Sequence, residues 1–234
     1  MSCVAVIPAR GGSKRIPRKN IRPFAGLPML AHGIKAAHES GLFDEVMVST
    51  EDPEIAEVAK QCGAVIPFMR PTSLADDYTG TQAIMKQTLE AYGQQGRSFH
   101  HACCIYATNP FLKPEFLASG LLQLQKNATR YAFAITSFPF PVQRSLVLDS
   151  AGCVSPAHPE YTMTRSQDLE EHYHDAGQFY WGDSDAFLTD LPLYAPHSSG
   201  VIIPRHLVQD IDTEEDWTRA EFMYQALQQA GELT

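Results

Sequence analysis

The stretch CVAVIPARGGSKRIPRKN, residues 3–20, holds the chain's first predicted strand and its most informative loop. Its apolar beginning predicts a short buried strand that ends at Pro8. The glycine-, proline- and cation-rich residues 9–28 predict a long loop. Apolar residues at helical spacing then predict a helix over 30–40. A strand, a loop and a helix in this order indicate the opening unit of an α/β sheet.

The alternation of strands and helices continues along the chain. Crossovers of this length suit parallel pairing, and functional loops then lie beyond the carboxyl ends of the strands. The sequence therefore predicts an α/β fold with an open, mostly parallel, doubly wound (Rossmann-like) sheet and helices on both faces. Further strands are predicted at 45–50, 64–68, 102–106 and 131–136, and further helices at 52–62, 81–92, 114–126 and 213–230.

One segment breaks this rhythm. Residues 138–175 are rich in Pro, His and Tyr and lack helical periodicity. We interpret them as an excursion from the main sheet, either a dimerisation arm or a lid. With 234 residues, of which 44% are hydrophobic, the chain suits a single domain over 1–234 that includes this excursion.

Composition excludes several classes of protein. The net charge of −9 argues against a general nucleic-acid binder. No apolar run approaches the ~20 residues of a membrane helix, and residues 1–8 do not resemble a signal peptide. The five cysteines include no CxxC pair, which argues against a disulfide framework or a structural zinc site. The sequence thus favours a cytoplasmic protein that binds neither nucleic acid nor a membrane.

Positive charge is concentrated near the N-terminus. Residues 1–38 contain no acidic residue and 7 of the 18 basic residues of the chain. A solvated basic face is one interpretation. A site for a small polyanion is the sharper one, because the charge gathers where the long loop begins.

The glycine pair within this loop favours the polyanion site. Gly11 and Gly12 allow a sharp turn whose N–H groups can face phosphate oxygens. Arg10 and Lys19 can add full charges to a triphosphate. The pattern matches neither the P-loop nor the dinucleotide-binding fingerprint, which weakens kinase and dehydrogenase interpretations. An ordinary glycine turn is the alternative.

Two carboxylates near the C-terminus, Asp210 and Asp212, are candidate metal ligands. On a strand end they would share one face, and Mg²⁺ accepts such oxygen ligands while keeping positions for substrate phosphates. Alternatively, Asp212 caps the helix that follows, and the acidic residues 214–216 complement its dipole. A phosphate loop in the same chain favours the metal.

Four segments together resemble the CMP-sugar synthetases, the cytidylyltransferases of sialic acid, related nonulosonic acids and, more distantly, KDO. The similarity extends over essentially the whole chain, and the first of the four motifs is highly specific. The segments are 7–20, 49–52 (STED), 70–75 (RPTSLA) and 210–216 (DIDTEED).

Residues 164–169 are similar to the RRQD segment of that family. Two further segments, 105–110 and 173–182, resemble its pseudaminic acid subgroup. Tyr106 and Ala107 depart from the QPTSP-type sequence usual in sialic acid enzymes. This departure favours pseudaminic acid over sialic acid.

The resemblance implies a nucleotide-diphospho-sugar transferase type of fold, a homodimer and a Mg²⁺ cofactor. It implies that CTP and a free nonulosonic acid give a CMP-sugar and pyrophosphate, for surface or flagellin glycosylation. Arg10, Lys19 and Asp212 would be catalytic, and Asp210 and Asp212 would hold the metal. The nucleotide would contact Ala9, Arg10, Gly11, Gly12, Ser13, Lys19, Asn20, Arg70 and Thr81. The sugar would contact Thr108, Asn109, Arg165, Gln167, Asp175, Gln178 and Tyr180.

Two alternatives stay open at this point. The same reaction could use N-acetylneuraminic or legionaminic acid, because few hydrogen bonds separate such isomers. A non-catalytic nucleotide-binding protein of the same fold is the alternative from another class.

Overall fold

The computed structural model of this chain describes residues 1–76, 78–126 and 129–233. Its central sheet has the strand order β10-β6-β9-β5-β1-β4. β1 runs parallel to β4 and β5, and β10 runs parallel to β6, whereas β9 is antiparallel to both of its neighbours. The predicted open, mostly parallel sheet is confirmed. These strands are β1 (Cys3–Pro8), β4 (Glu45–Ser49), β5 (His101–Ile105), β6 (Tyr131–Ser137), β9 (Tyr173–Asp183) and β10 (Ser198–Ile202).

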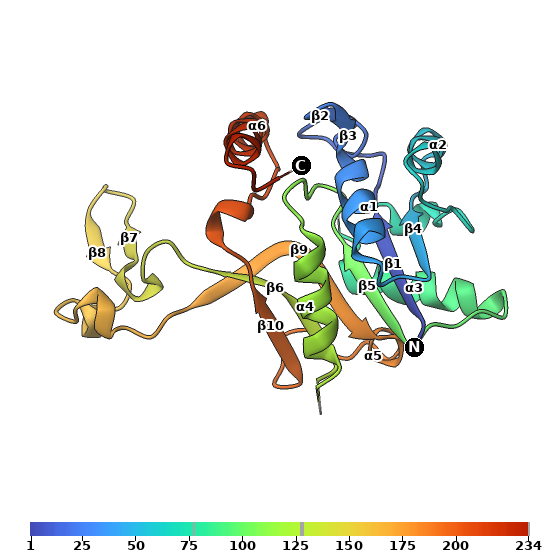
Figure 1. Cartoon of the computed structure of the whole chain (residues 1–234). Helices are drawn as coiled ribbons and strands as arrows, with labels where there is room; N and C mark the ends of the chain where they lie inside the picture. The colour runs from blue at the N-terminus through green and yellow to red at the C-terminus, as the bar shows by residue number, and fades with distance from the viewer. Residues whose placement is uncertain (77, 127–128, 234) are drawn as a thin grey trace.

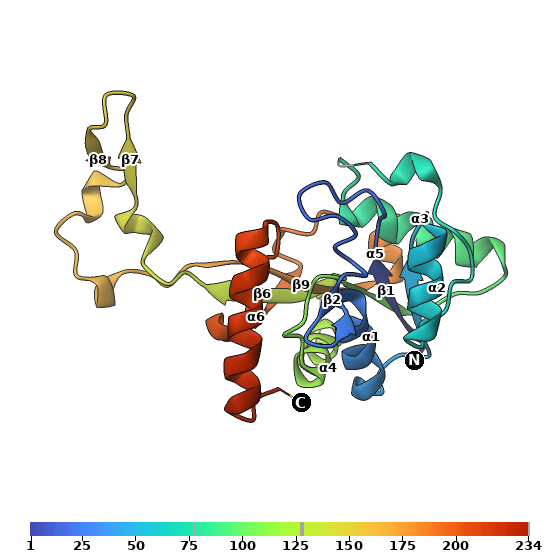
Figure 2. The same cartoon turned by 90° about the horizontal axis from the view of Figure 1, so that it is seen from above.

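Helices cover both faces of the sheet, as Figures 1 and 2 show. One face packs against α1, α2, α4 and α6, and the other against α3 and α5. The helices are α1 (Met29–Ser40), α2 (Pro53–Gln61), α3 (Thr81–Gln94), α4 (Pro114–Leu124), α5 (Ser184–Leu188) and α6 (Glu214–Gln229). The small strands are β2 (Pro23–Phe24), β3 (Leu27–Pro28), β7 (Leu146–Leu148) and β8 (Val154–Pro156).

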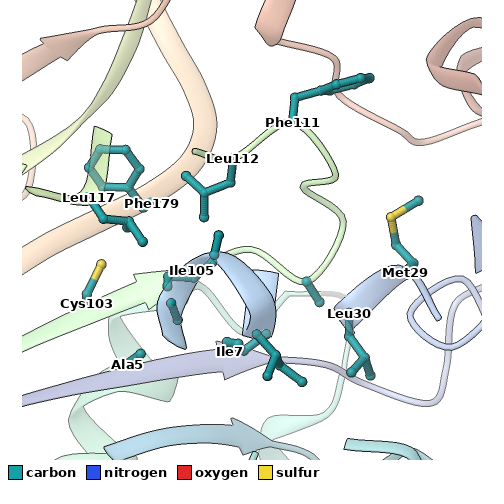
Figure 3. Close-up of a cluster of buried hydrophobic side chains, with 14 of the residues drawn as sticks. Ala5, Ile7, Met29, Leu30, Cys103, Ile105, Phe111, Leu112, Leu117 and Phe179 are labelled. Atoms are coloured by element: carbon teal, nitrogen blue, oxygen red, sulfur yellow. The ribbon is translucent and has the colours of Figure 1, made fainter. Parts of the chain in front are cut away.

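The alternation of side chains along β1 divides the core between the two faces. Ala5 and Ile7 join the cluster under α1 and α4, whereas Val4 and Val6 join the cluster under α3. All four side chains are fully buried. Figure 3 shows the first cluster, where Ile105 of β5 lies near Ile7. A strand that is apolar on both sides is typical of a sheet covered on both faces.

The prediction of a strand at 64–68 is wrong. The structure has a single β-bridge there, between Val65 and Met47. Val65 exchanges hydrogen bonds with Val46 and Val48 at 2.9 and 3.2 Å, and the pairing stops. Pro67 has no N–H with which to extend the ladder, so this edge of the sheet ends at β4.

Residues 138–172 form an arm between β6 and β9 that extends away from the sheet (Figures 1 and 2). The β6–β9 pair forms its base and continues as far as Ser137 and Tyr173. The arm contains the β7–β8 hairpin, in which every residue is exposed. The excursion predicted from sequence is therefore present, and its role as a dimerisation arm or a lid stays a prediction. In the described part of the chain, no helix combines the length and the apolar character needed to cross a membrane.

Candidate functional site

A cavity of about 550 Å³, the first cavity, lies at the carboxyl ends of β1 and β5. Loops at this edge of the sheet were expected to carry the site. The cavity gathers five cationic side chains beside two carboxylates, Asp76 and Asp212. Its lining includes the predicted residues Arg10, Ser13, Lys19, Asn20, Arg70, Thr81, Thr108 and Asp212, together with Lys14 and Arg15.

The loop that follows β1 and contains Gly11 and Gly12, which we call the glycine loop, is held in place by hydrogen bonds within the protein. The N–H of Gly11 donates to Oε1 of Glu51 at 2.7 Å, and the Asn20 amide donates to the carbonyl of Arg10 at 2.9 Å. A Cβ on Gly11 would lie 2.4 Å from Oδ2 of Asp52, so a larger residue there would have to displace the Asp52 carboxylate. The Gly11 N–H, which we expected to face a phosphate, therefore bonds within the protein.

Glu51 also pairs with Arg70, which it meets at 2.7 Å. The two side chains are only 14% and 2% exposed. One carboxylate thus joins the end of β4, the glycine loop and a guanidinium that lines the first cavity. Sequence analysis gave Glu51 no role, although it lies directly after the second strand of the sheet, where functional loops begin.

Asp52, the residue after Glu51, bonds both the start of α2 and Arg18 of the glycine loop. Its Oδ1 caps α2 by accepting from the N–H groups of Glu54 and Ile55 at 2.9 and 3.0 Å. Arg18, which has a positive φ of 56°, donates to its Oδ2 at 2.5 Å. This hydrogen bond holds the pKa of Asp52 below its ordinary value. Arg18 of the glycine loop is therefore positioned by a carboxylate that follows β4.

Asp212 faces the cations of the first cavity. It meets Arg15 at 2.7 Å and Lys19 at 3.3 Å, and Lys19 also donates to the carbonyl of Ile211 at 2.5 Å. The cap of α6 is instead Thr213, which forms a reciprocal capping box with Asp216. The alternative in which Asp212 caps this helix is thus excluded, and its carboxylate is directed to the cavity.

Asp210 lies close enough to Asp212 for their charges to interact. Surrounding protein atoms, which displace water, and then the negative charge of Asp212 raise the pKa of the Asp210 carboxyl. A cation between the two would relieve that repulsion. Among the described residues, no group of three or more His, Cys, Asp or Glu side chains could hold a metal ion. An ion here would complete its coordination with water or with ligand oxygens, as Mg²⁺ commonly does.

A second cavity, of about 880 Å³, lies beside the first. It is bounded by the ends of β6 and β9 and by the segment that leads to α6. Tyr106, directly after β5, lines both cavities. The other charged and polar residues that line the second cavity are Thr136, Ser137, His174, Asp175, Tyr180, Arg205, His206, Gln209, Asp210 and Arg219.

Several predicted site residues lie outside both linings. Gln178 is buried and its amide donates to the carbonyl of Leu207 at 2.6 Å, while Asn109 is only 3% exposed. Arg165 and Gln167 belong to the arm, where Arg165 pairs with Asp168 at 3.3 Å. Their roles stay predictions. Ala9, Gly11 and Gly12 belong to the glycine loop without lining the first cavity.

Two solved structures have the same fold. CMP:2-keto-3-deoxy-manno-octonic acid synthetase, solved with CTP, gives a TM-score of 0.68 at 18% identity, over 97% of this chain and 100% of that one. The 4-diphosphocytidyl-2C-methyl-D-erythritol synthase from Anaerococcus prevotii gives 0.64 at 14% identity, over 96% and 98%. The nucleotidyltransferase type of fold is confirmed.

Sequence comparisons give the family. The family model described as cytidylyltransferase matches residues 4–191. A pseudaminic acid cytidylyltransferase of Campylobacter jejuni is 43% identical over 224 residues, 96% of this chain and 97% of that protein. The CMP-N,N'-diacetyllegionaminic acid synthase of Legionella pneumophila is 30% identical, over 98% and 99%. This chain therefore belongs to the cytidylyltransferase family.

Proposed function

We propose that this chain transfers CMP from CTP to the anomeric hydroxyl of a nonulosonic acid, pseudaminic acid foremost, and releases pyrophosphate. The observation that carries the proposal is the pair of adjoining cavities, one strongly cationic, which share Tyr106. A triphosphate suits the first, and a polar acid suits the mixed charges of the second. Membership of the cytidylyltransferase family supports this assignment.

The cations of the first cavity would hold the triphosphate and stabilise the charge that develops on it. Arg10 and Lys19 come from the glycine loop, and Arg70, held by Glu51, adds a third cation. The hydroxyl oxygen of the sugar attacks the α-phosphorus, and the bond from that phosphorus to the pyrophosphate oxygen breaks. Transfers of this kind depend on positioning and charge neutralisation, which fixed cations supply.

Cytidylyltransferases of this kind generally use a divalent metal. We assign Mg²⁺ to Asp210 and Asp212, because these carboxylates repel each other and because Asp212 lines the first cavity and Asp210 the second. The bound ion would supply Lewis-acid polarisation of the phosphate. Lys19 and Arg15, which pair with Asp212, keep its carboxylate directed toward the nucleotide.

Pseudaminic acid is the proposed acceptor, because the relatives with that name are 43% identical to this chain. The legionaminic acid relative is 30% identical, and an N-acylneuraminate relative from Escherichia coli is 26% identical. Tyr106, in the wall between the cavities, supports the same choice, since its bulk limits the shape of the acceptor. The reaction would take place in the cytoplasm and supply a surface or flagellar glycan.

The arm supports a homodimer. Its hairpin exposes Leu146, Val147, Leu148 and Val154 by 52–69%. An isolated two-stranded hairpin is marginally stable in water, so an apolar partner would stabilise it. A second copy offers the same apolar surface, and a symmetric pair would bury both. Arg165 and Gln167 would then act at the site of the partner subunit.

The test is pyrophosphate release from CTP and Mg²⁺, with pseudaminic, legionaminic and N-acetylneuraminic acids in parallel. Asp212→Asn should lower kcat by about a thousandfold, a magnitude typical of lost electrostatic stabilisation. Glu57→Gln, on the exposed side of α2 and away from both cavities, is the matched control. Release with another acid would change the proposed acceptor, and CTP binding without any release would contradict the proposed reaction.

A further inference from the structure

The Asp175 carboxylate, in the lining of the second cavity, accepts an unusual set of hydrogen bonds. Its Oδ2 accepts from the hydroxyls of Tyr180 and Tyr194, each at 2.6 Å, and its Oδ1 accepts from the N–H of Gly177 at 2.8 Å. An ionised carboxylate offers about four acceptor positions. The described residues fill both positions on Oδ2 and one on Oδ1. One acceptor position on Oδ1 is therefore left for a ligand.

A bulge in β9 brings these groups together. Along β6, Phe133 pairs with Tyr180 and Ile135 pairs with Asp175, so the register shifts between them. The extra residues of β9 turn at Gly177, whose φ is +61°. Bulges of this kind re-aim side chains next to functional sites. Here the bulge lets Tyr180 donate to a residue five positions before it on the same strand.

Tyr194 reaches Asp175 from a different part of the chain. It lies in the loop between α5 and β10, outside every motif that sequence analysis singled out. Its ring packs edge-on against Phe133, with centroids 5.5 Å apart. The side chain is held by this contact and by its hydrogen bond to Asp175, although the residue is 68% exposed. Loss of water around the two hydroxyl groups, together with their hydrogen bonds to Asp175, raises the pKa of both Tyr180 and Tyr194, so both phenols stay protonated donors.

Asp175 and its two tyrosines lie beside Tyr106, the side chain that lines both cavities. The ring of Tyr106 lies 5.3 Å from that of Tyr180, and its hydroxyl is 3.0 Å from the hydroxyl of Thr81 in the first cavity. Asp175 is therefore fixed beside the side chain that separates nucleotide from acceptor. A sugar group that bonds to Asp175 would therefore be held at a fixed position with respect to the reacting phosphate of the nucleotide.

We propose that Oδ1 of Asp175 accepts a hydrogen bond from an N–H or O–H group of the acid sugar, and that Tyr194 is the positioning residue that, with Tyr180, fixes this carboxylate. The proposal rests on the proposed function, in which the second cavity binds the acceptor. A carboxylate that only accepts selects sugars with a donor at this point. A part-buried acceptor left unpaired by the wrong isomer would discriminate against that isomer.

The test is steady-state kinetics of Tyr194→Phe with CTP and pseudaminic acid. We expect the KM for the sugar to rise about tenfold, because a hydrogen bond to a charged group is lost. The KM for CTP and the thermal unfolding temperature should stay unchanged. Tyr173→Phe is the matched control, since its phenol also donates to a carboxylate, that of Glu171, outside both cavity linings.

A double-variant cycle separates positioning from general structure. Asp175→Asn should raise the KM for the sugar at least as much as Tyr194→Phe, and the double variant should be no worse than Asp175→Asn alone. Multiplying effects, or an equal rise in the KM for CTP, would overturn the proposal. If the wild-type protein released no pyrophosphate with any nonulosonic acid, the proposed function would fail instead.

Discussion

The first cavity and the arm differ in how their side chains are partnered. Around the cavity, charged groups are held by buried bonds to the sheet, as in the pairing of Glu51 with Gly11 and Arg70. On the arm, large apolar side chains such as Leu148 lie in water. The cationic wall is therefore held by bonds within one chain, whereas the apolar side chains of the hairpin are exposed to solvent.

The largest effect should come from breaking the buried pair under the glycine loop. Glu51→Ala leaves the 2%-exposed Arg70 side chain without its carboxylate partner. Removing one member of a buried pair costs about 3–5 kcal/mol. We therefore expect a lower midpoint in urea unfolding and a markedly weaker affinity for CTP by calorimetry.

Glu57→Ala, on the exposed side of α2, is the control for this substitution and should change neither quantity. If Glu51→Ala bound CTP normally, the cavity wall would not depend on the pair. The proposed difference between the first cavity, where buried bonds hold the charged groups, and the exposed arm would then be contradicted.

The next effect concerns the wall between the cavities. Tyr106→Gln removes the ring that packs on Tyr180 and the hydroxyl that meets Thr81. We expect the ratio of kcat/KM for pseudaminic acid to that for N-acetylneuraminic acid to fall about tenfold, the discrimination that a few contacts typically supply.

Tyr106→Phe sharpens this measurement, because it keeps the ring and loses only the hydroxyl. It should retain most of the preference for pseudaminic acid. An unchanged ratio in the glutamine variant would show that selectivity resides elsewhere in the second cavity.

A third substitution tests the arm. Leu148→Glu places a charge on the exposed hairpin, and we expect sedimentation velocity to show a dimer that becomes a monomer. Leu122→Glu on α4 is matched in exposure, 64% against 69%, and should leave the dimer intact. A wild-type protein that sediments as a monomer would contradict the dimer and leave the lid as the interpretation of the arm.

Most of the fold was predictable, because it depends on local patterns. The apolar residues of β1 and the capping of α2 by Asp52 identify their elements directly. The failed strand at 64–68 shows the limit, since an edge strand needs a partner as well as apolar residues, and Pro67 prevents one.

The site was predictable where function lies next to a motif, and unpredictable where it depends on contacts distant in sequence. Arg10, Lys19 and Asp212 were predicted because glycines and paired aspartates mark them, and all three line the first cavity. Tyr194 was missed because its partner, Asp175, is brought to it by a bulge in β9. Likewise, Gln178 belongs to the same segment, 173–182, as Asp175, but its amide donates to the carbonyl of Leu207. The spacing of residues in the sequence does not reveal this contact.

The smallest effect should be electrostatic and depends on pH. Arg18 holds the pKa of Asp52 below its ordinary value. This stabilisation is therefore fully present above the pKa of Asp52 in the unfolded chain and is lost as the pH falls through its lower folded value. Because the Arg18 side chain is 36% exposed, solvent screens the pair, and its contribution should be below about 1 kcal/mol.

Arg18→Gln should accordingly lower the free energy of unfolding by that small amount at pH 7 and by progressively less toward pH 3. Arg144→Gln, on the arm, is the control, because its guanidinium donates to the carbonyl of Thr164 and to no carboxylate among the described residues. Urea unfolding followed across this pH range measures the difference. A deficit that stayed constant with pH would mean that Arg18 acts through the packing of its side chain rather than through the charge of Asp52.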